Sequence, residues 1–198
     1  MTQLGITLDR AYVLGLLTAG GVISPNTFTI YLPFDQWGTE AETLNEIMGS
    51  LLTSTRKIFK RAYEVEIEAE FGGKKNTWVL KPRAAAHTFE EISDILSRIR
   101  DDLDKLGLPV HGDLLKSANL DKVRSELPKA IRSRFLTGIF DARASLTRSH
   151  RNRISSNPMV SVELPAHTPV NFVVGLCFLM TLDGSVTDQI LYNHPSFH

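Results

Sequence analysis

Residues 13–21 read Val-Leu-Gly-Leu-Leu-Thr-Ala-Gly-Gly, and residues 136–144 read Leu-Thr-Gly-Ile-Phe-Asp-Ala-Arg-Ala. Each stretch follows an aromatic residue, Tyr12 or Phe135, and each precedes turn residues and then a strand-like segment. Similarity within one chain at long spacing is the signature of duplicated architecture. We therefore expect two related halves, each of which opens with one of these helices.

Small residues recur at matching places in the two stretches. Gly15 and Ala19 are four residues apart, and so are Gly138 and Ala142. Residues at this spacing share one helix face, where small side chains let a partner backbone come close. A glycine inside a helix costs about 1 kcal/mol relative to alanine, so its presence at both places predicts that the two helices meet there. The alternative is two unrelated buried helices that each contain a glycine.

Hydrophobic periodicity and turn residues place the other elements of the first half. Asp9 is positioned to cap the first motif helix over residues 10–19. Alternation predicts strands and a period of 3.6 residues predicts helices. The expected order is a strand over 27–32, a helix over 39–60, strands over 63–71 and 77–81, and a helix that Thr88 caps and Gly107 ends.

The second half repeats this order in part. A linking helix over 114–125 precedes the second motif helix, which begins at Pro128 and is followed by a polar, basic loop, a strand over 159–164, a helix to residue 182 and a strand over 186–192. We divide the chain into a first repeat (1–110), a linker (111–127) and a second repeat (128–198). The second repeat is expected to lack a strand and a helix, or the chain to be a fragment of a longer gene product.

The paired stretches resemble the LAGLIDADG motif of homing endonucleases. The resemblance implies an α+β, pseudo-twofold duplicated fold in which the two motif helices pack together at the centre. It also implies two antiparallel sheets that form a saddle with helices on one side. In that family the saddle lies in the major groove of double-stranded DNA.

The chain departs from the family pattern at the residues that carry catalysis. The eighth motif position, where the family has an acid that holds divalent metal ions, is Gly20 in one copy and Arg143 in the other. The sixth position is Thr18 or Asp141, and we expect Asp141 to pack or cap rather than to bind metal. The resemblance therefore implies a fold without nuclease activity, metal or cofactor. Arg143 would contact a phosphate, or it would be solvated or paired with Asp141.

Charge points to a local nucleic-acid surface. The chain has 22 basic and 22 acidic residues, so binding by bulk charge is excluded. Basic residues are concentrated between Lys129 and Arg153, with Asp141 as the one acid: Lys129, Arg132, Arg134, Arg143, Arg148, Arg151 and Arg153. The candidate DNA-binding residues are Thr27, Thr29, Tyr31, Lys74, Lys75, Lys81, Arg83, Arg143, Arg148, Arg151, Arg153 and Ser161.

A row of acids argues against DNA binding by the first half. Glutamates occupy every second position from 64 to 70, so they share the outward face of a strand. Four carboxylates in a line would repel phosphates. Either this strand lies at the edge of its sheet, or the row pairs with lysines such as Lys81 or with a partner protein.

We expect a non-catalytic, sequence- or modification-specific DNA-binding module within a larger restriction or defence protein, associated with or fused to an effector. The alternatives are an RNA-binding, maturase-like splicing factor, a protein-interaction scaffold, and a nuclease with relocated metal ligands. The lone Cys177 is expected to be a buried apolar residue. No apolar run reaches the roughly 20 residues that span a membrane, and a cytoplasmic location is expected.

Overall fold

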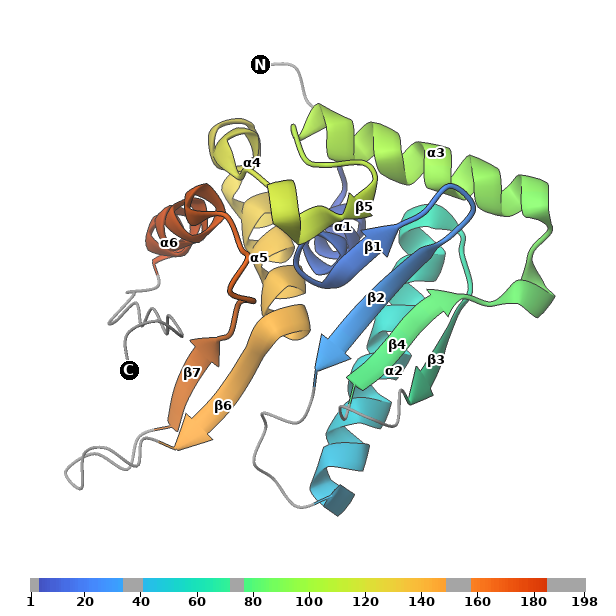
Figure 1. Ribbon diagram of the computed structural model, residues 1–198, viewed down its shortest axis with the longest axis horizontal. Coiled ribbons are helices and arrows are strands. Elements are labelled where there is room, and N and C mark those ends of the chain that lie inside the picture. The colour runs from blue at the N-terminus through green and yellow to red at the C-terminus, as the bar shows by residue number, and fades with distance from the viewer. Residues whose placement is uncertain (1–3, 34–40, 72–76, 149–157, 185–198) are drawn as a thin grey trace.

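A computed structural model describes residues 4–33, 41–71, 77–148 and 158–184 of the chain (Figure 1). The elements in this part of the chain follow in the order α1 (Leu8–Gly20), β1 (Gly21–Ile23), β2 (Phe28–Pro33), α2 (Ala41–Tyr63), β3 (Ile67–Phe71), β4 (Thr77–Pro82), a 3₁₀ turn (Ala84–Ala86), α3 (Phe89–Lys105), β5 (Gly112–Asp113), a second 3₁₀ turn (Leu114–Ser117), α4 (Asp121–Glu126), α5 (Lys129–Arg143), β6 (Ala144–Arg148), β7 (Pro158–Val162) and α6 (Val170–Asp183).

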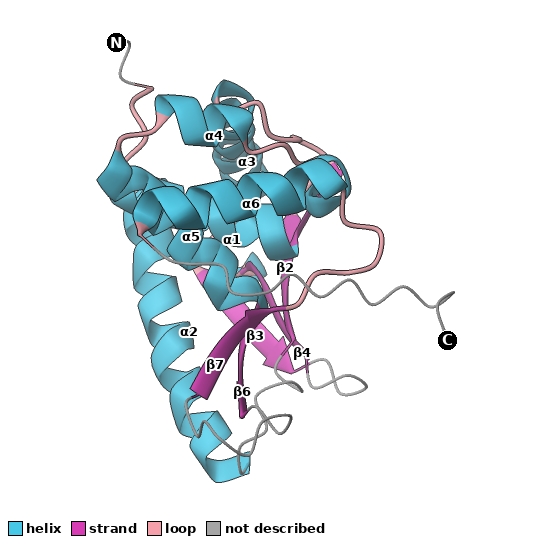
Figure 2. Cartoon of the chain, turned by 90° about the vertical axis from the view of Figure 1, so that its left-hand side faces the viewer, coloured by secondary structure: helices cyan, strands magenta, loops and turns pink. Residues whose placement is uncertain are grey.

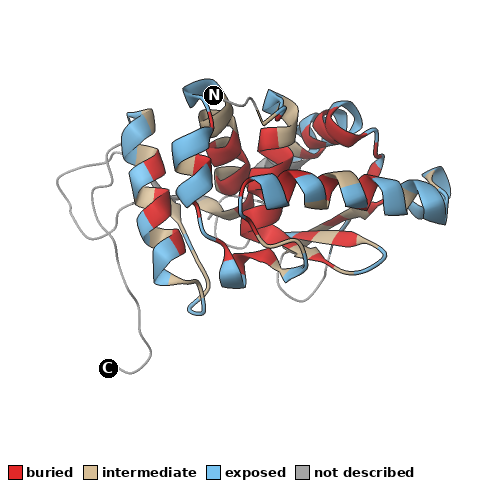
Figure 3. Cartoon of the chain, turned by 90° about the horizontal axis from the view of Figure 1, so that it is seen from above, coloured by how far each residue is buried: buried red, intermediate tan, exposed pale blue. Residues whose placement is uncertain are grey.

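The strands form two antiparallel sheets of unequal size. One has five strands in the order β3-β4-β2-β1-β5, and the other pairs β6 with β7. Figures 2 and 3 show the helices gathered on one side of the strands. The expected α+β class is confirmed. The expected saddle of two duplicated antiparallel sheets is not shown, because the described residues form one sheet of five strands and a second of two.

Helix α1 begins earlier than expected, because Thr7 rather than Asp9 is its N-cap. The Thr7 hydroxyl accepts a hydrogen bond from the backbone N–H of Arg10 (3.3 Å). The Asp9 carboxylate instead accepts from the guanidinium of Arg61 on α2, at 2.7 Å. Thr and Asp are both good caps, so a partner 52 residues away along the chain decides between them.

The alternation expected along the second strand is confirmed. Phe28, Ile30 and Leu32 are buried on the helix side of the sheet. The strand expected over 63–71 begins only at Ile67, because α2 continues to Tyr63. Glu64 then adopts a left-handed backbone conformation with φ 62°, which ends the helix and turns the chain into β3.

Local caps on α3 agree with the sequence. The Thr88 hydroxyl accepts from the backbone N–H of Glu91 (3.2 Å), and the Glu91 carboxylate accepts from the backbone N–H of Thr88 (2.9 Å). This reciprocal pair is a capping box. Gly107 follows the helix with φ +65°, a left-handed conformation that glycine adopts without strain.

The second half differs from expectation in three places. The linking helix over 114–125 is broken into a 3₁₀ turn and α4, and the Asn119 side chain accepts from the backbone N–H of Asp121 at the break (2.9 Å). Part of the expected basic loop forms β6, because this segment pairs with β7 through backbone hydrogen bonds. The local sequence of the segment did not predict this pairing. The strand expected over 186–192 lies outside the described residues.

Residues 111–127, expected to link the two repeats, contribute to the first sheet and to the core. Strand β5 joins the first sheet, with Asp113 opposite Val22. The leucines that follow it are buried in a hydrophobic core that α1, α2, α3, α5 and α6 also line. The two halves therefore share one core. Cys177, expected to be buried, is only partly so.

Candidate nucleic-acid interface

Helices α1 and α5 pack against each other through their glycines. A Cβ atom added to Gly15 would overlap the backbone carbonyl oxygen of Phe135, and one added to Gly138 would overlap that of Tyr12. Tyr12 precedes Gly15 by three residues, as Phe135 precedes Gly138. The contact is therefore reciprocal, which is the property of an interface around a twofold axis.

The other pair of small residues lies further along the same interface. Ala19 and Ala142 are both buried. A Cβ atom on Gly20 would lie 3.5 Å from the Cβ of Ala142 and 2.8 Å from the carbonyl oxygen of Tyr31. The C-terminal ends of α1 and α5 thus come together near Gly20 and Arg143, the eighth residues of the two repeated stretches.

Arg143 occupies this meeting point and caps the opposite helix. Its Nε donates to the carbonyl oxygen of Ala19 at 2.7 Å. A cation at a helix C-terminus compensates unpaired carbonyls and the negative end of the helix dipole. Burial lowers the pKa of Arg143, an effect partly offset by Asp113. The expected pairing of Arg143 with Asp141 is not found, because the two side chains have different partners.

Asp141 forms part of a polar cluster between α1, α2 and α5. Its carboxylate accepts from the Tyr12 hydroxyl at 2.8 Å, and that hydroxyl also lies 3.3 Å from the Thr55 hydroxyl. The guanidinium of Arg134 stacks 4.9 Å from the centre of the Tyr12 ring. Burial raises the pKa of both Asp141 and Tyr12. Asp141 therefore packs between helices, as expected from the sequence.

The two helices lead into their hairpins in the same way. The backbone N–H of Gly21 donates to the carbonyl of Leu17, and that of Ala144 donates to the carbonyl of Phe140. Both capping residues are extended, with ψ 147° and 145° respectively. Neither helix ends in a left-handed glycine turn, so each passes directly from its last turn into a strand.

Equal positions along the two hairpins carry two of the expected DNA-binding residues. Gly21 pairs with Ile30 across the first hairpin, and Ala144 pairs with Val162 across the second. Thr29 and Ser161 are the residues directly before these partners, so they occupy the same register position. Both are hydroxyl residues of intermediate burial. The sequence could suggest each residue, but only the register relates them.

The uncovered face of the five-stranded sheet holds Thr29 and Tyr31. Their neighbours Ile30 and Leu32 point into the core, so these two point to the other face. Tyr31 is 43% exposed and pairs with Val79 on β4. Thr27 lies before the strand in a turn, where the Ser24 backbone N–H donates to its carbonyl at 2.9 Å.

The glutamate row is paired within the chain, and two of the explanations considered from the sequence, the edge position and the pairing with Lys81, are confirmed. Strand β3 is an edge strand of the sheet. Lys81 donates to Glu70 at 2.7 Å and lies 3.5 Å from Glu68, and the bond to Glu70 is the main cause of the raised pKa of Lys81. Glu66 pairs with Lys60 at 3.4 Å, and Glu64 with Arg98 at 3.8 Å. Lys81 is therefore engaged with carboxylates.

The basic run from Lys129 to Arg153 is not one surface patch. Arg134 stacks on Tyr12 and Arg143 caps α1, as described above. The Arg132 guanidinium lies 3.8 Å from Asp183 and donates to two backbone carbonyls. Three of the seven basic residues thus hold helices together. Arg148 ends β6, and Lys74, Lys75, Arg151 and Arg153 lie outside the described residues.

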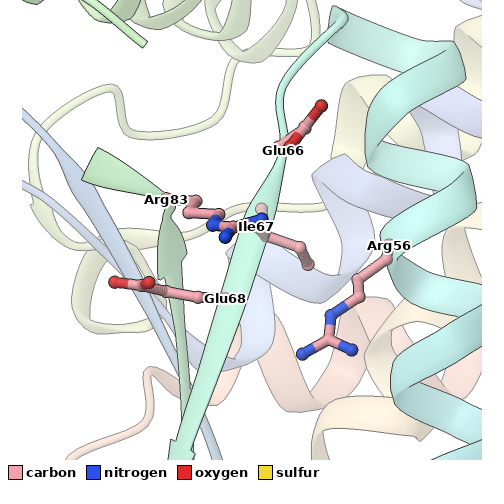
Figure 4. Close-up of a pocket in the computed structure, with 5 residues that line it drawn as sticks. All are labelled: Arg56, Glu66, Ile67, Glu68 and Arg83. Atoms are coloured by element: carbon pink, nitrogen blue, oxygen red, sulfur yellow. The ribbon is translucent and has the colours of Figure 1, made fainter. Parts of the chain in front are cut away.

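A hollow of about 430 Å³ opens beside the edge strand β3 (Figure 4). Arg56 of α2 and Arg83, which follows β4, line it together with Glu66, Ile67 and Glu68. The backbone N–H of Arg83 donates to the carbonyl of Glu66 at 2.8 Å and extends the sheet by one hydrogen bond. Arg83 was expected from the sequence to bind DNA. Arg56 was not, since nothing local relates it to the strand.

The rest of the described structure adds no metal centre or membrane segment. In these residues, no group of three or more His, Cys, Asp or Glu side chains is close enough to hold a metal ion. None of the helices in the same part of the chain is both long and apolar enough to cross a membrane. Comparison with protein-family models and with curated proteins found no match.

Proposed function

We propose that this chain is a non-catalytic module that binds double-stranded DNA, with selectivity for a sequence or a modification, on a pseudo-twofold frame similar to that of LAGLIDADG proteins. The observation that carries the proposal is the reciprocal contact of Gly15 and Gly138 with the opposite helix. That contact relates the two helices, and each helix leads directly into a hairpin. An extended surface with two related reading elements suits a DNA duplex, whose grooves repeat along an axis.

The pseudo-twofold relation is supported by three further features. The helix ends share the same extended cap. The two hairpins begin directly at those caps. Thr29 and Ser161 take the same register position in the two hairpins. Two unrelated helices would not be expected to share all three features. Duplication of one helix–hairpin unit is therefore the simplest explanation.

The two hairpins are proposed to contact DNA differently. In the first sheet Lys81 is paired with Glu68 and Glu70. Thr29 and Tyr31 are therefore the residues proposed to contact base edges, where their hydroxyl groups can donate or accept hydrogen bonds. In the second, β6 ends at Arg148 and the connection to β7 contains Arg151 and Arg153. Arginines are suited to phosphate contacts, which set affinity and position rather than sequence choice.

The absence of catalysis is proposed from the chemistry at the helix ends. Two-metal cleavage of a phosphodiester needs carboxylates that hold the ions. The ends of α1 and α5 hold Gly20 and Arg143 instead, and Arg143 already compensates the carbonyl end of α1. A fixed guanidinium at this place repels a divalent cation. Asp141 instead accepts a hydrogen bond from the Tyr12 hydroxyl, which also contacts Thr55 of α2.

Fluorescence anisotropy with a labelled duplex tests the proposal. We expect binding at low salt whose affinity falls steeply as salt rises, since phosphate contacts release counterions. Arg151→Ala/Arg153→Ala should weaken binding and flatten the salt dependence by about two ions. Lys57→Ala/Lys122→Ala removes the same charge from exposed positions on α2 and α4, outside the candidate interface, and is the matched control.

Three outcomes would overturn the proposal. The first is no detectable affinity for any duplex at low salt. The second is equal loss of binding in both double variants, which would indicate bulk charge alone. The third is nicking of supercoiled plasmid in Mg²⁺ or Mn²⁺ that Asp141→Asn abolishes, which would restore the nuclease alternative. Preference for structured RNA over duplex would favour the maturase-like alternative.

A further inference from the structure

Strand β3 has a free edge in the described part of the chain, where β4 is its one partner strand. The backbone N–H of Arg83 donates to the carbonyl of Glu66, so every second residue of β3 from Glu66 onward bonds to β4. The backbone groups of the alternate residues, Ile67 and Ala69, therefore point away from β4. Pro82 lies opposite Ile67 and agrees with this phase, because proline has no N–H to donate.

Two arginine side chains flank this edge on opposite faces of the sheet. Ile67 is buried on the helix side of β3, and Arg56 of α2 lies on that same side (Figure 4). Arg83 is directly opposite Glu66 and shares its face. That face is the uncovered one, because side chains alternate along a strand. Both arginines line the hollow of about 430 Å³ beside β3.

The guanidinium groups of Arg56 and Arg83 are the unpaired charges of this hollow. Neither group has a hydrogen bond or an ion pair with a residue of the described ranges. The two glutamates that line the hollow lie 3.4 and 3.5 Å from a lysine, in the pairs Glu66–Lys60 and Glu68–Lys81. The hollow therefore offers two cations to a ligand from outside the chain.

We propose that the edge of β3 binds an extended, acidic segment of a partner polypeptide, which adds to the sheet as a further strand. The outward backbone groups of Ile67 and Ala69 supply the main-chain hydrogen bonds of such an addition. Successive side chains of an extended segment point to opposite faces. Two adjacent acidic residues would therefore reach Arg56 on one face and Arg83 on the other, where a guanidinium can bind a carboxylate through two hydrogen bonds.

The edge fits a peptide better than it fits other anions. The outward carbonyl groups of Ile67 and Ala69 need hydrogen-bond donors, which a peptide backbone has and a phosphate diester lacks. The two guanidiniums also lie on opposite faces of a strand, so one small anion is too compact to lie on both faces at once. A pair of carboxylates on adjacent residues matches this arrangement.

The test uses the whole chain without nucleic acid and two fluorescein-labelled peptides of the same composition. The first, Thr-Val-Thr-Glu-Glu-Val-Thr-Val, has adjacent glutamates that point to opposite faces. The second, Thr-Val-Glu-Thr-Glu-Val-Thr-Val, has both glutamates on one face. Fluorescence anisotropy should show that the first peptide binds about fivefold more tightly, which is the upper end for one exposed ion pair.

Two single variants test the arginines. Arg56→Ala and Arg83→Ala should each weaken binding of the first peptide about fivefold. Both side chains are exposed, so the variants should fold. Lys57→Ala is the matched control, because Lys57 is an exposed cation of α2 that does not line the hollow. It should leave the affinity unchanged.

N-methylation of the first peptide tests the strand addition. Methyl groups on every second backbone nitrogen remove the donors along one edge of the peptide. One of the two possible phases should abolish binding, and the other should preserve it, because only one edge of the peptide faces β3. Equal binding of the two methylated peptides would overturn the proposed strand addition.

Four further outcomes would overturn the proposal. They are no binding of the first peptide at about 1 mM, equal affinity for the two unmethylated peptides, equal weakening by Lys57→Ala and by the arginine variants, and full competition by inorganic phosphate, which would assign the hollow to small anions. None of these measurements involves DNA. Failure of this proposal is therefore distinguishable from failure of the DNA-binding proposal.

Discussion

Replacing Gly138 by alanine tests the central helix contact directly. The new Cβ would overlap the carbonyl oxygen of Tyr12 and lie 2.7 Å from the backbone nitrogen of Leu16. Both atoms belong to the backbone of α1, so they cannot turn aside as a side chain would. The helices must separate, and their small-residue interface must open.

The magnitude follows from two opposing effects. Alanine in place of glycine favours an isolated helix by about 1 kcal/mol. Overpacking a rigid contact costs typically 1–3 kcal/mol and occasionally more, and backbone atoms place this site at or above the upper end. We expect Gly138→Ala to lower the free energy of unfolding by about 2 to 3 kcal/mol, or the midpoint of thermal unfolding by roughly 4 to 12 °C.

Gly49→Ala is the control, because Gly49 also lies inside a helix but a Cβ there would meet no atom within 4 Å. It should raise stability by up to about 1 kcal/mol. Circular dichroism during urea and thermal unfolding measures both variants. Because Gly15→Ala opens the same interface, the double variant with Gly138→Ala should cost less than the sum of the two. If Gly138→Ala is as stable as Gly49→Ala, the close approach of α1 and α5 is wrong.

Two further predictions concern buried carboxylates. Asp102→Ala should lower the free energy of unfolding by about 3 kcal/mol or more in urea titrations, because it leaves buried donors without their acceptor. The control is Asp101→Ala, at an exposed neighbouring position, which should change the free energy of unfolding little. Equal effects of the two substitutions would refute the argument. The donors that Asp102 now accepts from are Arg10, Tyr63 and Lys105. Burial raises the pKa of Asp141 above 3.8, so the native state binds its proton more tightly than the unfolded state. The wild type should therefore lose stability relative to Asp141→Asn as the pH rises from 3.8 through the raised pKa, and a difference independent of pH would contradict this.

The sequence located the structural centre of the molecule because that centre depends on residues with few alternatives. Only glycine permits the approach of two backbones, and two glycines at matching places within similar helices therefore predicted where α1 and α5 meet. The alternation of buried residues along β2 and the capping box of α3 could also be predicted from the sequence. Each follows from a rule that involves residues only a few positions apart.

The electrostatic predictions were less successful, because the charge of a residue does not show which residue it pairs with in the folded chain. The basic run from Lys129 to Arg153 looked like one surface, yet Arg132, Arg134 and Arg143 each hold a helix or ring. The glutamate row looked repulsive, yet Lys81 and other cations neutralise it. These pairings join residues that are distant along the chain, so no local pattern could assign them.

By itself, the sequence determined the α+β class, the helix pair and the presence of Gly20 and Arg143, rather than acids, at the helix ends, since these follow from side-chain size, local periodicity and residue identity. Only the tertiary structure decided that β6 exists, that Arg143 caps α1, that residues 111–127 belong to the core and that α6 presents an apolar face. Those outcomes depend on which surfaces meet. Which surfaces pack together is decided by pairing and burial between residues that are far apart along the chain, so it cannot be predicted from any single segment.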